Sequence, residues 1–308
     1  MTSENTLHLN PGYNRRKFIS TTSKAVGSMV LLSPSLTSFA KGFNKNKSIT
    51  VGEIMDMFIG EVQGAPFDKT VDTLKAGNRE IIVTGIVTTM FATIEVIRKT
   101  IELGANFIIA HEPTFYNHED NFDWLENDEV YKYKADLLKR NNIAIWRNHD
   151  YIHSHVPDGV VKALVSKLDW TNYYDVTTSV ATLPQITLKA LVQKVKMNLG
   201  ISMVRYIGSL SQPCKKILLM PGAAGGRRQI TAIVKQKPDV LVCGEIQEWE
   251  TAEYVRDARA KGEQLSLIVL GHIASEEPGS EYMASWLKEK LPFLQVTHVA
   301  AKNSLSFL

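Results

Sequence analysis

Four apolar residues, Phe107–Ala110, run directly into His111, Glu112 and Pro113. A short apolar run that ends at a proline predicts a strand buried on both faces, because proline cannot continue a central ladder. The two polar residues then lie at the carboxyl end of a buried parallel strand, where open α/β sheets bind ligands. Since neither side chain enters a core without a partner, the pair indicates a ligand site or a satisfied core histidine beside a surface glutamate.

Alternating strand and helix patterns predict an α/β fold with mostly parallel sheets flanked by helices. Residues 81–87 and 107–113 read as strands around a helix at 92–103, which makes a βαβ unit. Further strands are expected at 143–146, 216–220, 239–245, 265–272 and 294–299, and further helices at 48–60, 129–140, 159–168, 187–199, 251–260 and 279–290. The Thr-rich stretch 171–186 has no regular pattern, so we place a loose boundary there between two similar halves, 41–170 and 171–308.

Polar clusters follow strands in both predicted halves. The strand at 143–146 leads into a segment that holds His149, Asp150 and His153, and the strand at 265–272 delivers His272 and then Glu276. In each half a strand, a helix, a glycine and a second strand lead to a histidine. If the two βαβ units face each other, both strand ends meet in one cleft.

Charge is concentrated at the amino terminus. Of the 35 basic and 32 acidic residues among the 308, residues 1–40 hold four basic and one acidic, which leaves 31 of each sign in the remainder. A formally neutral body gives no electrostatic reason to expect nucleic acid or an anionic membrane as a partner. That body also has no apolar run long enough to span a bilayer.

The first 40 residues have the order of an export signal. Asn14–Ile19 contains adjacent arginines, Ala25–Leu32 is mildly apolar, and Ser38–Ala40 is a small-x-small cleavage pattern. This order indicates Tat-type export, which would place the protein in the periplasm. The alternative interpretation is a disordered basic tail. Export would permit a disulfide between Cys214 and Cys243, whose spacing does not decide it, and without a CxxC motif a thiolate zinc site is not expected.

A glycine-rich turn follows the strand at 216–220. Pro221–Arg228 contains three glycines before the next helix. Such a turn can cradle an anion on its backbone N–H groups or can simply be a tight structural turn. Neither P-loop nor GxGxxG spacing is present, so both interpretations stay open.

Three motifs resemble the Nif-three-like family of dinuclear-metal proteins, also described as type-2 homologues of GTP cyclohydrolase I. They are the strand end His111–Phe115, the stretch His149–His153 followed by Gly159–Val160, and Gly271–Glu276, with Cys243–Glu245 ahead of the last. The resemblance extends over 48–308. It implies a Nif-three-like fold with a site for two divalent ions in the cleft between two α/β halves.

Carried over position by position, the resemblance implies five metal ligands. They are His111, Glu112, His153, His272 and Glu276. Glu112 stands where the family has histidine, and His153 stands where it has aspartate. The two departures compensate each other, because the set still holds three imidazoles and two carboxylates, which suits two adjacent divalent ions that share a carboxylate.

Four neighbouring residues have roles that the sequence leaves open. His149 is expected to orient a ligand or to face a substrate, and Asp150 is the rival of His153 as a ligand. Glu245 is the candidate general base. Trp249, where the family usually has histidine, either narrows the cleft or is a buried helix aromatic.

Two functions are compatible with this ligand set. The first is a metal-dependent hydrolase with two divalent ions per chain (zinc, manganese or iron) and a small-molecule substrate, in line with the GTP cyclohydrolase label. The second is a non-catalytic metal-binding or interaction module, which the homohexamer implied by the family resemblance would suit. The sequence fixes neither the metal nor the substrate.

The export signal gives a direct prediction. Mass spectrometry of the native protein should find a mature chain that begins near Lys41, because cleavage follows Ala40. An intact amino terminus in a cytoplasmic fraction would contradict export.

Overall fold

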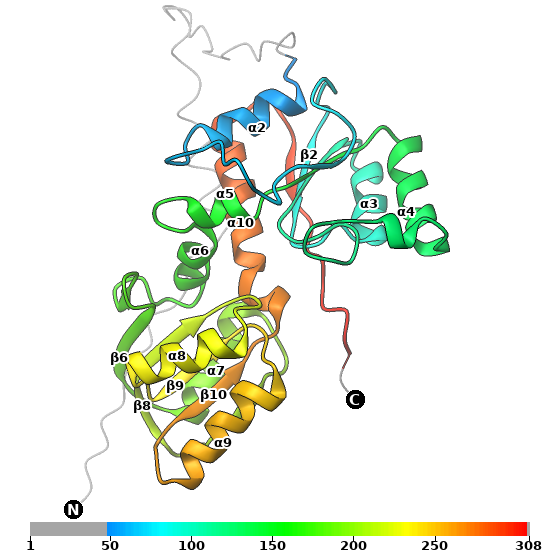
Figure 1. Cartoon of the computed structure of the whole chain (residues 1–308). Helices are drawn as coiled ribbons and strands as arrows, with labels where there is room; N and C mark the ends of the chain where they lie inside the picture. Colours follow the sequence, from blue (N-terminus) through cyan, green and yellow to red (C-terminus); the bar gives the residue numbers. More distant parts are fainter. Residues whose placement is uncertain (1–47, 307–308) are drawn as a thin grey trace, which may run out of the picture. The chain divides into compact units, whose positions relative to one another are not determined.

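The computed structural model describes residues 48–306 (Figure 1). The predicted export signal at 1–40 lies outside the described residues. Within them, two β-sheets are each covered by helices on both faces. The sequence-predicted α/β class is therefore confirmed.

The first sheet holds the strand that leads to His111 and Glu112. Its order is β1 (Leu74–Ala76), β4 (Ala144–Arg147), β3 (Phe107–Ala110), β2 (Ile86–Thr89) and β11 (Val296–His298). All neighbouring strands are parallel except the β1–β4 pair. Helices α2 (Val51–Ile59) and α10 (His272–Lys290) cover one face, and α3 (Ile94–Glu102) and α4 (Glu129–Arg140) cover the other.

Strand β3 shows why a continuous apolar run was needed. Phe107 and Ile109 belong to the core under α2 and α10, whereas Ile108 and Ala110 belong to the core under α3 and α4. Successive side chains of a strand point to opposite faces, so both faces must be apolar when both are covered. The backbone N–H of His111 still bonds the Thr89 carbonyl, which carries the strand geometry into the polar pair.

The second sheet is mixed rather than mostly parallel. Its order is β5 (Tyr174–Asp175), β6 (Val180–Thr187), β8 (Pro213–Met220), β9 (Val240–Cys243), β10 (Ser266–Val269) and β7 (Arg205–Ile207). Only the central β8, β9 and β10 are parallel to one another. Helices α6 (Gly159–Lys167) and α7 (Leu188–Leu199) cover one face, and α8 (Gly226–Gln236) and α9 (Glu253–Ala260) cover the other.

Three sequence expectations differ from the structure. The stretch 171–186 contains β5 and most of β6; the β6 register shifts between Thr182 and Ile186 and hides the strand pattern. The strand expected at 81–87 begins at Ile86, and Ile82 forms only a bridge to Thr50. The last strand, β11, pairs with β2 and so returns to the first sheet, although it follows the expected boundary at 171.

Helix α10 begins earlier than its sequence suggests. The sequence predicted a helix from about 279 to 290, but the helix runs from His272 to Lys290 and includes Pro278. His272 and Glu276 are therefore one turn apart on one helix instead of on a strand and a loop. Two further short elements are α5 (Asp150–Ser154) and a π-helix at Glu248–Ala252.

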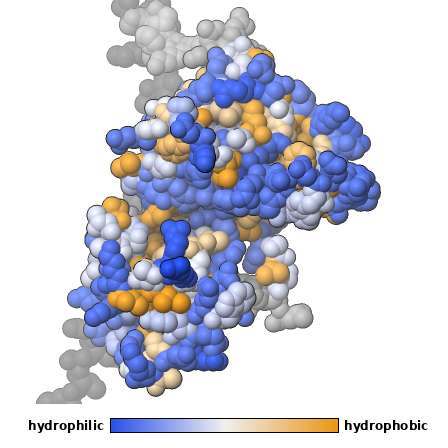
Figure 2. Space-filling view, in the orientation of Figure 1, coloured by the Kyte–Doolittle hydropathy of each residue, from blue (hydrophilic) through white to orange (hydrophobic). Residues whose placement is uncertain are grey.

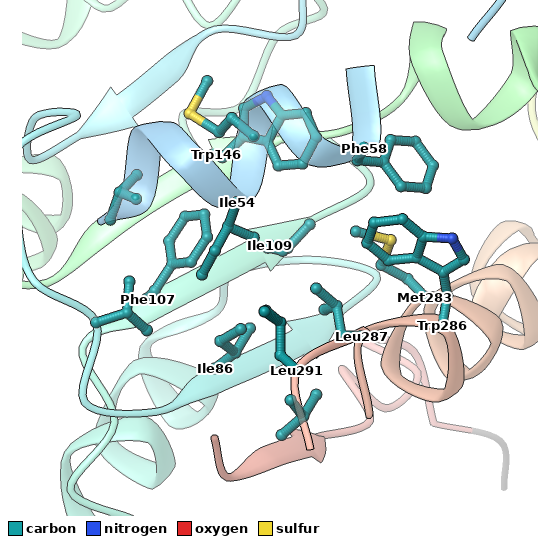
Figure 3. Close-up of a cluster of buried hydrophobic side chains, with 14 of the residues drawn as sticks. Ile54, Phe58, Ile86, Phe107, Ile109, Trp146, Met283, Trp286, Leu287 and Leu291 are labelled. Carbon is teal, nitrogen blue, oxygen red and sulfur yellow. The ribbon is translucent and has the colours of Figure 1, made fainter. Parts of the chain in front are cut away.

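The core of the first sheet joins it to α10. Trp286, Met283 and Leu287 of α10 lie over the strands beside Phe58 of α2 (Figure 3). The Phe58 ring meets the Trp286 ring edge-on at a centroid distance of 5.0 Å. This packing fixes the first turn of α10 near the end of β3, which is where the polar residues gather.

Among residues 48–306, no helix is both long and apolar enough to cross a bilayer. The face seen in Figure 2 is mostly hydrophilic, with hydrophobic residues in separate small groups. Cys214 and Cys243 are both free and buried, so they do not form a disulfide with each other.

Replacement of Phe58 should test this core. Phe58 is fully buried, and Phe58→Ala should lower the free energy of unfolding by about 3–5 kcal/mol because it leaves a cavity under Trp286. Urea denaturation followed by circular dichroism measures the change. The matched control is Phe122→Ala at a position that is 41% exposed, where a loss as large as that of Phe58→Ala would contradict the account.

Candidate metal centre

Polar residues follow the carboxyl ends of four parallel strands. His111 follows β3, His149 follows β4, Glu245 follows β9 and His272 follows β10. The expectation that the two sheets would each contribute to one site is met by their contacts, since His272 Nε2 lies 3.0 Å from Glu112 Oε1. Residues that are far apart in the chain therefore form one cluster.

Glu276 lies at the centre of this cluster. Its side chain is buried, and its Oε2 lies 2.9 Å from His272 Nε2 and 3.4 Å from His111 Nε2. Its Oε1 faces a third imidazole, at 4.0 Å from His153 Nε2. Burial disfavours the carboxylate anion, but the neighbouring imidazoles of His111 and His272 hold the pKa of Glu276 well below its usual range.

Glycine makes room for that carboxylate. Gly222 has φ +65, and a Cβ at this position would lie 2.2 Å from Glu276 Oε1. The glycine-rich turn is therefore a close-approach turn at this residue. It is also tied to α10, because the Gly222 N–H donates to Ser275 Oγ at 3.0 Å.

His272 is surrounded by three carboxylates. Its Nε2 lies within 3.0 Å of both Glu112 and Glu276, and its Nδ1 lies 2.9 Å from Glu245 Oε1. Burial opposes the imidazolium, but hydrogen bonds to Glu112, Glu245 and Glu276 outweigh it and raise the pKa of His272 to about 12. The cluster thus carries enough negative charge to favour a cation.

His149, the N-cap residue of α5, and His153 within α5 present two more imidazoles. They are one helical turn apart, and their rings lie at a centroid distance of 4.9 Å. The His111 ring stacks on His149 at 4.9 Å and meets His153 at 5.1 Å. Burial, reinforced by the neighbouring His111 imidazole, lowers the pKa of His149 to about 4, which favours its neutral form.

Each of the four imidazoles is held by its Nδ1 atom. The partners of His149, His153 and His272 are Asp150, Asp158 and Glu245, each at 2.9 Å, and that of His111 is the Asn148 carbonyl at 3.2 Å. Metal-bound histidines are typically oriented in this way through the nitrogen that does not bind the metal. All four Nε2 atoms are left to face the cluster.

The residues present fit divalent cations. Two groups have ligand atoms within 4.8 Å of one another: His111, His149 and His153, and His111, Glu112 and Glu276. His111 Nε2 is buried without a hydrogen bond, which is costly for a polar atom unless something else satisfies it. The Nε2 atom of His272 carries at most one proton, which cannot make good hydrogen bonds to both Glu112 and Glu276. A cation among these groups would satisfy both the Nε2 atom of His111 and that of His272.

The five predicted ligands all lie in this cluster: His111, Glu112, His153, His272 and Glu276. The structure adds His149, which the sequence placed in a supporting or substrate-facing role. Its spacing of four residues from His153, across the start of α5, is the signal that favours a ligand. Asp150 is turned away from the cluster centre, because its carboxylate bonds His149 and the Thr70 hydroxyl.

Two other sequence interpretations change. The predicted general base, Glu245, accepts the Nδ1–H of His272, so its contact is that of a group that orients a ligand. Trp249 was expected in a cleft or in a core, but it is 75% exposed in the π-helix, so the buried interpretation is wrong.

A cluster of imidazoles and carboxylates at the strand ends of a two-sheet α/β fold defines a candidate metal-binding protein. The chain belongs to the Duf34/NIF3 (NGG1p interacting factor 3) family, whose model matches residues 70–304. It is 25% identical over 228 residues to the GTP cyclohydrolase 1 type 2 homolog of Clostridium perfringens, across 71% of this chain and 83% of the relative. It is 26% identical over 230 residues to the homolog of Clostridium acetobutylicum, across 71% and 81%.

Solved structures confirm the fold. The Staphylococcus aureus hypothetical protein SA1388 is 22% identical with a TM-score of 0.67, and the alignment covers 85% of this chain and 99% of that protein. A Bacillus cereus protein related to NIF3 is 17% identical with a TM-score of 0.68, over the same shares of the two chains. The Nif-three-like fold expected from the sequence is thus confirmed.

The close approach at Gly222 can be tested with a matched pair of variants. Gly222→Ala and Gly225→Ala both place a side chain at positive φ, which costs on the order of 1–3 kcal/mol each, but only the first meets Glu276. We expect Gly222→Ala to lose metal affinity because it displaces the carboxylate, and Gly225→Ala to keep it. Calorimetric titration with Zn²⁺ and thermal denaturation measure the two effects. Equal metal affinities in the two variants would contradict the role of Gly222.

Proposed function

We propose that this protein binds two divalent cations in the described cluster and acts as a metal-dependent hydrolase. The observation that carries the proposal is the arrangement of four imidazoles, each held by Nδ1 and each with Nε2 within 4.0 Å of the Glu112 or the Glu276 carboxylate. A structural ion pair needs no such uniform orientation.

The two oxygens of Glu276 suit a bridging role. Oε2 faces His272 and His111, whereas Oε1 faces His153. In this proposal Glu112 and His272 would help to hold one ion, His111, His149 and His153 would help to hold the other, and Glu276 would contribute to both. This set of imidazole and carboxylate ligands accommodates zinc, manganese or iron, and the chemistry of the ligands does not select one.

When bound, such a pair of ions makes a water molecule acidic enough to attack at neutral pH and balances the charge that develops in hydrolysis. The protein side chains orient the proposed ligands. Glu245, Asp158 and Asp150 fix the tautomers of His272, His153 and His149, so that every inward nitrogen can bind a cation. The role of Glu245 in this proposal is therefore positioning, in place of the general base predicted from the sequence.

The competing proposal is a metal-binding or interaction module without catalysis. It is favoured by the contact of Glu245, because the candidate base is already bonded to His272. Turnover separates the two proposals. A panel of phosphoesters, amides and nucleotides should be tested with metal-loaded protein, and GTP belongs to it because the Clostridium relatives are named as GTP cyclohydrolase homologs.

Two further properties are proposed with this function. Tat export would place the protein in the periplasm, where a small molecule other than cytosolic GTP is the expected substrate. We also propose a homohexamer, and light scattering of the mature protein tests the assembly. Neither a nucleic acid nor a membrane surface is expected as a partner, because the body of the chain is formally neutral.

Removal of one central ligand should empty the site without unfolding the chain. His272→Ala and Glu276→Ala should each reduce bound metal from two ions to one or fewer per chain, because each removes a proposed ligand. The chain should stay folded, because the strands that lead to the site are apolar and form without the metal. Metal content by mass spectrometry beside circular dichroism measures both properties.

The controls replace the same residue types outside the cluster centre. His118 is exposed, and Glu277 is next to Glu276 but pairs with His298. His118→Ala and Glu277→Ala should keep both ions. Full metal content in Glu276→Ala would contradict the proposed site, and chelator-resistant turnover by the purified protein would contradict a metal-dependent hydrolase.

A further inference from the structure

A fully buried arginine lies behind the cluster. Arg147 is the last residue of β4 and is 0% exposed, in a strand that is otherwise apolar. A buried guanidinium is costly unless its donors are paired, and breaking such a pair leaves a strongly disfavoured charge. The partners of Arg147 therefore indicate what the residue does.

The guanidinium uses all of its nitrogens. Nε donates to the His111 carbonyl at 3.3 Å, Nη1 donates to the His118 carbonyl, and Nη2 donates to Glu112 Oε2 at 3.3 Å. One planar group thereby holds the backbone of one proposed ligand and the side chain of another. A lysine could not do this, because its ammonium is a single point donor.

The contact divides the two oxygens of Glu112. Oε2 is bonded to Arg147, whereas Oε1 lies 3.0 Å from His272 Nε2 and 3.9 Å from His149 Nε2. Only one oxygen therefore faces the cluster. Without the arginine, the flexible glutamate would be free to turn both oxygens inward or to rotate away.

The positive charge of Arg147 is also compensated by Asp120. Asp120 Oδ2 lies 3.7 Å from Arg147 Nη1 and 3.3 Å from Lys75 Nζ, and both side chains of the Lys75–Asp120 pair are buried. Asp120 is itself fixed, because its Oδ1 accepts the Phe115 N–H at 2.7 Å. The buried charges thus alternate in sign from Glu112 to Lys75.

We propose that Arg147 is a positioning residue that holds Glu112 as a one-oxygen metal ligand aimed at the space beside His272. The proposal rests on the proposed metal site and adds a specific dependence within it. All three donor atoms of Arg147 are engaged by the protein itself, so in this proposal Arg147 is not a ligand. Its effect on metal binding should therefore pass entirely through Glu112.

The experiment is a double-mutant cycle with Co²⁺ as the only ligand. Arg147→Met and Glu112→Gln are made singly and together, and Co²⁺ stoichiometry, affinity and visible absorption are measured. We expect Arg147→Met to weaken the binding of one of the two Co²⁺ ions by about 10- to 100-fold. It should also change the absorption spectrum, because a Glu112 carboxylate released from Arg147 would alter the coordination of Co²⁺. When Arg147→Met is added to Glu112→Gln, the Co²⁺ affinity should change further by less than a factor of about 2, because the carboxylate that Arg147 orients is already gone.

Two further variants keep the test decisive. Arg147→Lys retains the charge but loses the fork, and it should bind two ions with an altered spectrum even if Arg147→Met fails to fold. Arg98→Met is the matched control, because this arginine lies on α3 and donates to Tyr133 away from the cluster; it should match the wild type.

The outcomes separate this inference from the proposed function. If wild-type protein binds no Co²⁺ at the cluster, both are wrong. If the wild type binds two ions but Arg147→Met and Arg147→Lys leave affinity and spectrum unchanged, only the positioning role is wrong. A loss of affinity that is equally large with and without Glu112→Gln would show a general structural role and would also overturn it.

Discussion

The buried Glu276 carboxylate holds the imidazoles of His111 and His272 within 3.4 Å of one oxygen, where helix α10 meets the end of strand β3. An anion in such a place needs compensating charge. The structure supplies it from both sheets, and Gly222 leaves the space that any side chain would fill. The packing of α10 on the first sheet, through Trp286 and its neighbours, is what brings the helix start to this point.

The remaining polar residues act on this centre from outside. Carboxylates or a carbonyl hold the Nδ1 atom of each imidazole, and Arg147 holds the outer oxygen of Glu112. Such supporting contacts decide ligand orientation before any ion binds, and they are worth a large part of the affinity of a metal site. The same contacts give Glu245 a supporting role, which is why the proposed chemistry relies on the cations and on ligand orientation rather than on a free carboxylate base.

The sequence predicted the local features and missed the long-range ones. The apolar run before His111 and the polar residues that follow the later strands are local signals, so most strands and the fold class could be predicted from them. The five clustered residues were instead implied by the family resemblance. Strand β6 was missed because its register shifts, and the pairing of β11 with β2 depends on a return across the chain that no local pattern encodes. The role of Arg147 was overlooked because it depends on hydrogen-bond partners that are distant in sequence. The most distant is His111, 36 residues earlier.

Anomalous scattering from crystals of manganese-loaded protein tests the central claim most directly. The account predicts two anomalous peaks per chain, on either side of the Glu276 carboxylate. One peak should lie at Glu112 and His272, and the other at His111, with His149 and His153 beside it. Loaded crystals with no peak at Glu276, and with its carboxylate still bonded only to imidazoles, would contradict the assignment of this cluster as a metal centre.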